Sequence, residues 1–214
     1  MSELIDINHI NINSSSSSTE RVEKPLKPSE LIFINEKESE RKDIELKTVE
    51  LISDSLKDIC DENEDSQIIN SNYEMERPFT TETCPNISIK DYLMHLAKFT
   101  KMEQSTLILV LIYIDRICNI NKFQLNYRNI YKLILASTYV AIKFNEDSHY
   151  ALKVYAKIGE ISPSELEYLE FHFLILIKFA LNVDESLYNK YSETLLKEED
   201  DDDDEDDNEE EAYV

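Results

Sequence analysis

The chain has 214 residues, of which 42% are hydrophobic, and its formal net charge is −23. It contains one Gly, no Trp and five Pro. Tight two-residue hairpin turns need residues that tolerate positive φ, usually Gly, so this composition argues against β-sheets. The sequence therefore predicts an all-α protein built around one compact domain.

The charge is distributed unevenly along the chain. Residues 86–196 contain twelve Lys or Arg and twelve Asp or Glu, so the whole net charge lies in the flanking segments. A neutral core has no basic stripe for phosphate groups, so we expect neither a nucleic-acid nor a membrane partner. The longest uncharged apolar run, Leu107–Ile114, has roughly 8 residues, whereas a membrane-spanning helix needs about 20.

Three cysteines, Cys60, Cys84 and Cys118, are not arranged with the spacing of metal ligands. Free cysteines are typical of a reducing compartment. We therefore expect an intracellular location, in the nucleus, the cytoplasm or both.

Changes in composition divide the chain into five segments. Residues 1–42 are polar, with too little apolar content to offset the cost of ordering, and we predict that they are disordered. In residues 43–60 apolar side chains recur near helical spacing, which predicts an amphipathic helix. Residues 61–85 form a polar linker, residues 86–196 the main domain, and residues 197–214 a solvated, disordered acidic tail.

Within the main domain, apolar periodicity and capping signals predict five helices and a sixth short one. They cover residues 89–99, 103–118, 127–144, 150–158, 163–178 and 187–196. Ser88 is placed to cap the first of them. Ser162, followed by Pro163 and Glu165, forms a capping box at the start of the fifth. Gly159, the single glycine, is expected to end the fourth in a left-handed conformation.

The helical segments carry a recognisable pattern. Tyr113-Ile114-Asp115-Arg116, Ala141-Ile142-Lys143-Phe144 and Leu169-Glu170 resemble three elements of the cyclin box, and the resemblance covers roughly residues 86–191. Ile87–Leu93, Phe144–Tyr150 and Tyr155–Ser162 look closest to the phosphate-pathway (P-type) and plant U-type cyclins. The resemblance implies a single five-helix cyclin box. The additional N-terminal helix and the disordered acidic ends, expected from periodicity and composition, complete the predicted fold.

The resemblance also implies a function. Cyclins are regulatory subunits, not enzymes, and they bind and activate a cyclin-dependent protein kinase as a heterodimer. In the family a lysine and a glutamate hydrogen-bond the kinase, and these would be Lys143 and Glu170. The apolar companions at this face would be Val140, Phe144, Leu174, Phe179 and Leu181. Without the resemblance, Lys143 and Glu170 would be interpreted as solvated helix residues.

Nothing in the sequence indicates chemistry of its own. The four histidines include no pair with metal-ligand spacing, and no Gly-rich phosphate loop is present. We therefore expect no cofactor, no metal and no small-molecule substrate.

One position departs from the family pattern. Asn86 stands where cell-cycle cyclins have an arginine that packs beside the aspartate of the second helix. The sequence therefore gives no support for a substrate-docking patch of that type. It also leaves Asp115 without its usual partner, and Arg116, a backbone N–H group and solvent are the alternatives.

A second hypothesis is a helical scaffold or adaptor that has the cyclin box but binds a non-kinase partner. Such proteins usually have two repeats and basic surfaces. We expect a single repeat here, because about twenty residues follow Leu195. We also expect no basic surface, because the main domain carries no net charge.

Overall fold

The computed structural model describes residues 28–65 and 73–197, and the side chains of residues 46–64 and 74–195. The chain divides into two compact units, Met1–Ser39 and Glu40–Val214, and every residue whose side chain is described belongs to the second. The disorder predicted for residues 1–27 and 198–214 lies outside the described residues.

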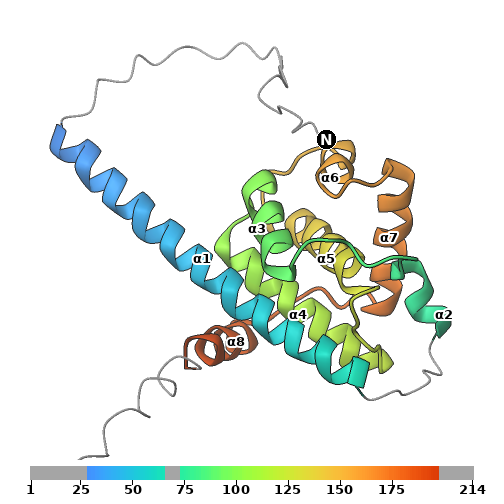
Figure 1. Ribbon diagram of the computed structural model, residues 1–214. Coiled ribbons are helices and arrows are strands. Elements are labelled where there is room, and N and C mark those ends of the chain that lie inside the picture. The colour runs from blue at the N-terminus through green and yellow to red at the C-terminus, as the bar shows by residue number, and fades with distance from the viewer. Residues whose placement is uncertain (1–27, 66–72, 198–214) are drawn as a thin grey trace, which may run out of the picture. The chain divides into compact units, whose positions relative to one another are not determined.

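All regular secondary structure in the described residues is helical, with no strand among them, which confirms the all-α prediction (Figure 1). In chain order the helices are α1 (Pro28–Asp65), α2 (Tyr73–Glu76), the 3-10 helix η2 (Arg77–Phe79), α3 (Ile89–Thr100), α4 (Gln104–Asn121), α5 (Ile130–Asn145), α6 (Leu152–Ile158), α7 (Pro163–Leu176) and α8 (Glu185–Lys197).

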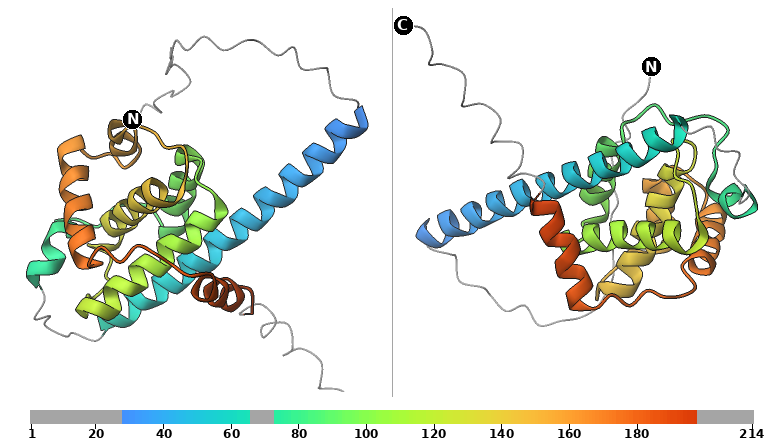
Figure 2. Two further views of the ribbon diagram at one scale, coloured as in Figure 1. Left: turned by 180° about the vertical axis from the view of Figure 1, so that it is seen from behind. Right: turned by 90° about the horizontal axis from the view of Figure 1, so that it is seen from below.

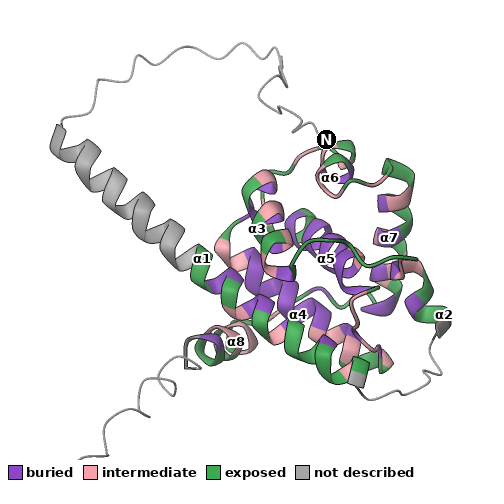
Figure 3. Cartoon of the chain, in the orientation of Figure 1, coloured by how far each residue is buried: buried purple, intermediate pink, exposed green. Residues whose placement is uncertain are grey.

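Helix α5 lies at the centre of the domain and packs against α3, α4 and α7. Its sequence is apolar on every side, as expected of a helix surrounded by others. Small residues at Ala136, Ser137 and Ala141 are fully buried and allow neighbouring helices to cross closely. The buried Ser137 hydroxyl donates to the Val110 carbonyl of α4 at 3.1 Å. Burial is concentrated on α4 and α5 (Figure 3).

Two predicted helix starts are confirmed at atomic level. The Ser88 hydroxyl accepts a hydrogen bond from the Asp91 N–H at 3.0 Å. The Ser162 hydroxyl accepts one from the Glu165 N–H at 3.1 Å, with Pro163 in the first turn. Each bond satisfies an N–H group that has no partner within its own helix.

The expected conformation of Gly159 is wrong. Its φ is −81°, and the left-handed residue at this corner is the next one, Glu160, with a φ of 55°. The requirement for glycine comes from packing instead. A Cβ atom at position 159 would lie 2.3 Å from Cδ2 of Leu135 in α5. The missing side chain therefore lets the α6–α7 corner approach the central helix.

Helix α5 begins at Ile130, three residues after the expected start at Tyr127. The Asn126 side chain accepts from the Arg128 N–H, and the Asn129 side chain accepts from the Asn126 N–H, both at 3.0 Å. Asparagine side chains often compete in this way with helical backbone bonds. These local bonds keep residues 127–129 in a turn.

Helix α1 is longer at both ends than the helix expected over residues 43–60. Residues 28–42, predicted to be disordered, form its first turns. Glu and Lys, which recur in this segment, are good helix formers. The later turns lie along α4 (Figure 2). Gln104 at the start of α4 donates a hydrogen bond to Thr48, and Asn63 donates one to the Leu125 carbonyl beyond the end of α4.

Apolar burial attaches this part of α1 to the domain. Val49, Ile52, Leu56 and Cys60 are buried in the same core as α3–α7.

Among the described residues, no helix is both long and apolar enough to cross a membrane.

Candidate functional site

Lys143 and Glu170, predicted separately as contact residues, face each other across two helices. Lys143 lies in the last turn of α5 and Glu170 in the middle of α7, and Lys143 Nζ is 2.5 Å from Glu170 Oε1. Their side chains are 38% and 17% exposed. The two residues therefore form one ion pair at the surface that joins α5 to α7.

The surroundings of Lys143 favour its charged form. Partial burial lowers the pKa of Lys143, but the hydrogen bond and the charge of Glu170 outweigh burial, so the pKa lies above its ordinary value. The ammonium group also lies 5.0 Å from the centre of the Tyr139 ring, within the range of a cation–π contact. Lys143 is thus held in place by two partners of its own chain.

Beside this pair, α7 presents apolar side chains to solvent. Phe171 and Ile175, one turn apart, are both exposed, Phe171 by 58%. Phe144 follows Lys143, and Phe179 follows the end of α7 with 67% of its surface exposed. We call Phe144, Phe171, Ile175 and Phe179 the α7 face. Large apolar side chains that remain exposed beside a charged pair are typical of a protein-binding site.

The predicted apolar companions fall into two groups. Phe144 and Phe179 are exposed, and Leu174 is partly buried. Val140 and Leu181 are 3% and 9% exposed, so they lie beneath the surface and support the residues above them. Their role in binding a partner stays a prediction.

Phe171 and Ile175 are not among the contact residues predicted from the sequence. Helix α7 already buries one complete apolar side, through Leu166, Leu169 and Phe173. An amphipathic helix at the surface of a domain needs only one apolar side to pack against the core. The signal in the sequence was therefore a surplus of large apolar residues at i, i+4 spacing on the opposite side.

The backbone after α7 is unusual. Lys178 and Phe179 have φ values of 54° and 56°, a left-handed conformation that side-chain-bearing residues rarely adopt. Hydrogen bonds from α4 hold the following carbonyls. Tyr113 Oη donates to Leu181 O at 2.7 Å, and Arg116 donates to Ala180 O and to Asn182 O.

Asp115 has a partner that the sequence did not indicate. The Tyr191 hydroxyl of α8 donates to Asp115 Oδ2 at 2.6 Å, and Asn119 donates to the same oxygen at 2.8 Å. Arg116, one of the proposed partners, bonds the loop after α7 instead. Asn86, at the position of the family arginine, is exposed ahead of α3. In this chain Asp115 therefore anchors α8 to α4.

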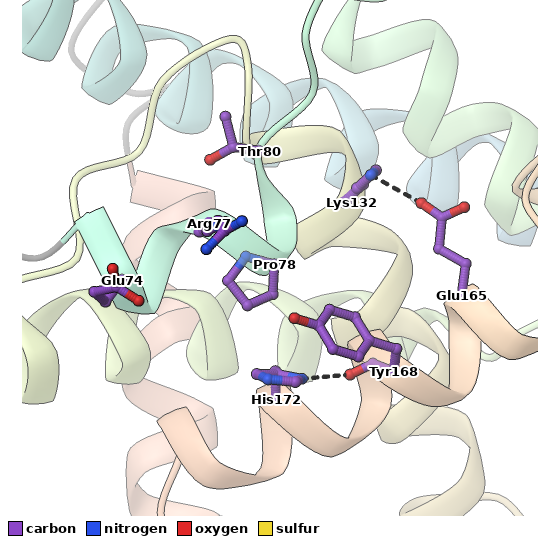
Figure 4. Close-up of a pocket in the computed structure, with 8 residues that line it drawn as sticks. All are labelled: Glu74, Arg77, Pro78, Thr80, Lys132, Glu165, Tyr168 and His172. Carbon is purple, nitrogen blue, oxygen red and sulfur yellow. Dashed lines mark hydrogen bonds and ion pairs between the residues drawn. The ribbon is translucent and has the colours of Figure 1, made fainter.

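A polar cleft of about 540 Å³ lies between η2, α5 and the first turns of α7 (Figure 4). Lys132 Nζ and Glu165 Oε1 pair across it at 2.8 Å. His172 Nδ1 is 2.8 Å from the Tyr168 carbonyl, so it must donate there. The groups in the cleft thus make structural contacts, and they do not form a nucleophile held by a base.

The described residues contain no group of three or more His, Cys, Asp or Glu side chains that could hold a metal ion. Their most distinctive surface is the α7 face with its ion pair. The fold and this surface define an all-helical domain with exposed apolar side chains next to a surface ion pair.

Comparison of the sequence with known proteins identifies the family. The cyclin family model matches residues 5–181. Cyclin-U4-3 of Arabidopsis thaliana is 39% identical over 121 residues, 56% of this chain and 55% of the relative. Cyclin-U4-1 of the same plant is 29% identical over 162 residues, 75% of this chain and 80% of the relative. PHO85 cyclin-7 of Saccharomyces cerevisiae is 31% identical over 131 residues, 56% of this chain and 46% of the relative.

The chain belongs to the cyclin family. Its relatives include the plant U-type cyclins, a P-type cyclin of rice and a yeast PHO85 cyclin, which confirms the branch inferred from the sequence. For most of these relatives the match spans about half of their length.

Proposed function

We propose that this chain binds a cyclin-dependent protein kinase as a heterodimer and activates it, without contributing a catalytic residue of its own. One observation supports this most strongly: the Lys143–Glu170 pair lies at the surface, and Phe144 and Phe171, the chain neighbours of its two residues, are exposed. Apolar area supplies most of the energy at protein interfaces, and charged groups set within it fix the register. The name of one relative, PHO85 cyclin-7, also links that cyclin to PHO85.

The activation is allosteric in this proposal. The ends of α5 and α7 press on the mobile regulatory helix of the kinase and favour the arrangement in which its catalytic ion pair forms. Lys143 and Glu170 offer donors and acceptors to that helix from a preformed position. Because each already holds the other, little side-chain entropy is lost when the kinase binds.

Charge reversal tests the role of the pair. Lys143→Glu and Glu170→Lys each leave two like charges facing each other, and each should weaken kinase binding. The double variant restores an ion pair between α5 and α7 with its direction reversed. If both residues contact the kinase, the double variant still binds at least about thirtyfold more weakly than the unmodified chain, a loss of ~2 kcal/mol or more.

The same two helices provide a matched control. Lys132 and Glu165 also pair between α5 and α7, but at the polar cleft. The double variant Lys132→Glu, Glu165→Lys should therefore bind the kinase within about twofold of the unmodified chain.

The assay is co-purification of the tagged full chain with a cyclin-dependent kinase identified by mass spectrometry, followed by phosphorylation of a generic peptide. If the double variant Lys143→Glu, Glu170→Lys bound and activated the kinase as well as the unmodified chain, the pair would only join α5 to α7 and would not contact the kinase. Recovery of non-kinase partners alone would favour the scaffold hypothesis instead.

A further inference from the structure

Phe179 is the most exposed large apolar side chain among the described residues, at 67%, and its backbone adopts a disfavoured conformation. Local bonds form the loop around it: the Phe179 N–H donates to Leu174 O at 2.9 Å, and the Ala180 N–H to Ile177 O at 3.0 Å. These bonds leave the carbonyls of residues 180–182 to be fixed by another element.

Helix α4 fixes all three carbonyls. Tyr113 and Arg116 lie one helical turn apart, so they point to the same side of α4. Tyr113, fully buried, holds Leu181 O, and the partly exposed Arg116 holds the carbonyls of Ala180 and Asn182 on either side. A charged donor on a carbonyl gives a stronger hydrogen bond than a neutral one.

The Tyr113 hydroxyl also accepts a hydrogen bond from the end of α5, the helix that carries Lys143. Asn145, the last residue of α5, donates through Nδ2 to Tyr113 Oη at 3.2 Å. Asn145 lies two residues after Lys143. The chain of bonds Asn145–Tyr113–Leu181 therefore connects the end of helix α5 that carries Lys143 to the loop that carries Phe179.

We propose that Tyr113 and Arg116 are positioning residues that hold the loop of residues 178–182 and so present Phe179 to the kinase in register with Lys143. This inference rests on the proposed function, because it assigns Phe179 to the kinase contact. Strained backbone persists where the surroundings determine it strongly, and such strain is concentrated at functional sites.

The first measurement needs no kinase. In the free full chain, Arg116→Ala should accelerate amide hydrogen exchange at Phe179, Ala180 and Leu181 by about tenfold or more, because the loop opens locally, while the centre of α5 keeps its protection. Arg128→Ala, which removes an exposed arginine near the opposite end of α5, is the control and should leave exchange in the loop unchanged.

The second measurement asks whether Arg116 acts through Phe179. Arg116→Ala should weaken kinase binding about tenfold when Phe179 is present, and by less than about threefold in a Phe179→Ala background. A general structural role would give the same loss in both backgrounds. Tyr113→Phe, which keeps the ring and removes the hydroxyl, repeats the test if Arg116→Ala does not fold.

Each outcome decides the inference. Faster exchange confined to the loop, together with a loss of affinity that depends on Phe179, supports it. Unchanged exchange, or equal losses in the two backgrounds, overturns it. If the unmodified chain binds no cyclin-dependent kinase, the proposed function fails and so does presentation to the kinase, while the exchange result still decides separately whether α4 holds the loop.

Discussion

Gly159 lies at the corner between α6 and α7, and replacing it with alanine probes how that corner is seated on α5. The added Cβ would lie 2.3 Å and 2.8 Å from the two δ carbons of Leu135, which is buried. Because the surrounding core is closely packed, moving Leu135 should cost about 1–3 kcal/mol. The φ of −81° suits alanine, which recovers about 0.4–1 kcal/mol from the unfolded chain.

We therefore expect Gly159→Ala to lower the free energy of unfolding by about 1–2 kcal/mol, or the melting temperature by roughly 2–8 °C. The assay is urea unfolding followed by circular dichroism. Leu135→Val lacks both δ carbons, so in that background Gly159→Ala should have little effect. Glu160→Gly tests the alternative position: it should stabilise the domain by about 0.5–1 kcal/mol, because the left-handed residue is 160.

A Gly159→Ala variant as stable as the unmodified chain would refute the packing argument. An equal loss with and without the δ carbons of Leu135 would also refute it, and would point to a backbone requirement at position 159.

Three further predictions concern cysteines, pH and the α7 face. At pH 8 an alkylating reagent should label exposed Cys84 in the native chain, but Cys60 and Cys118 only after unfolding. The reason is that burial raises the pKa of the Cys60 and Cys118 thiols to about 12. Equal labelling rates for all three cysteines would contradict this prediction. Above about pH 9 these two thiols ionise only in the unfolded chain, so urea titrations should show the free energy of unfolding falling toward pH 12, by up to ~1.4 kcal/mol per pH unit for each thiol. Constant stability over this range would be inconsistent with buried neutral thiols. Phe171→Ser should weaken kinase binding about tenfold or more with little change in stability, whereas Met94→Ser, another exposed apolar residue, should leave binding unchanged; equal losses would show that the α7 face is not the contact.

Much of the architecture follows from local sequence. The scarcity of glycine, with a single one in the chain, predicted an all-helical fold. The serines at positions 88 and 162 marked two helix starts, and in the structure each accepts the expected capping hydrogen bond. Apolar segments such as residues 107–114 indicated buried helices. These features are local because propensity, periodicity and capping depend on residues within a turn or two of each other.

The candidate site depended on the fold. The sequence suggested Lys143 and Glu170 through a family resemblance, but only the packing of α5 on α7 paired them. The partner of Asp115 is Tyr191, 76 residues away in the chain. A side chain at position 159 would meet Leu135 of α5, although the φ of Gly159 is an ordinary one. Val140 and Phe144, one turn apart on α5, proved to be buried and exposed respectively.

The sequence by itself thus determined the helical class, the two helix starts capped by Ser88 and Ser162, and the family, because each depends on short-range patterns. The tertiary structure decided which apolar residues remain on the surface and which polar groups meet. Those outcomes depend on the crossing of helices distant in the chain, and a distance of a few ångströms between them separates an ion pair from two solvated charges.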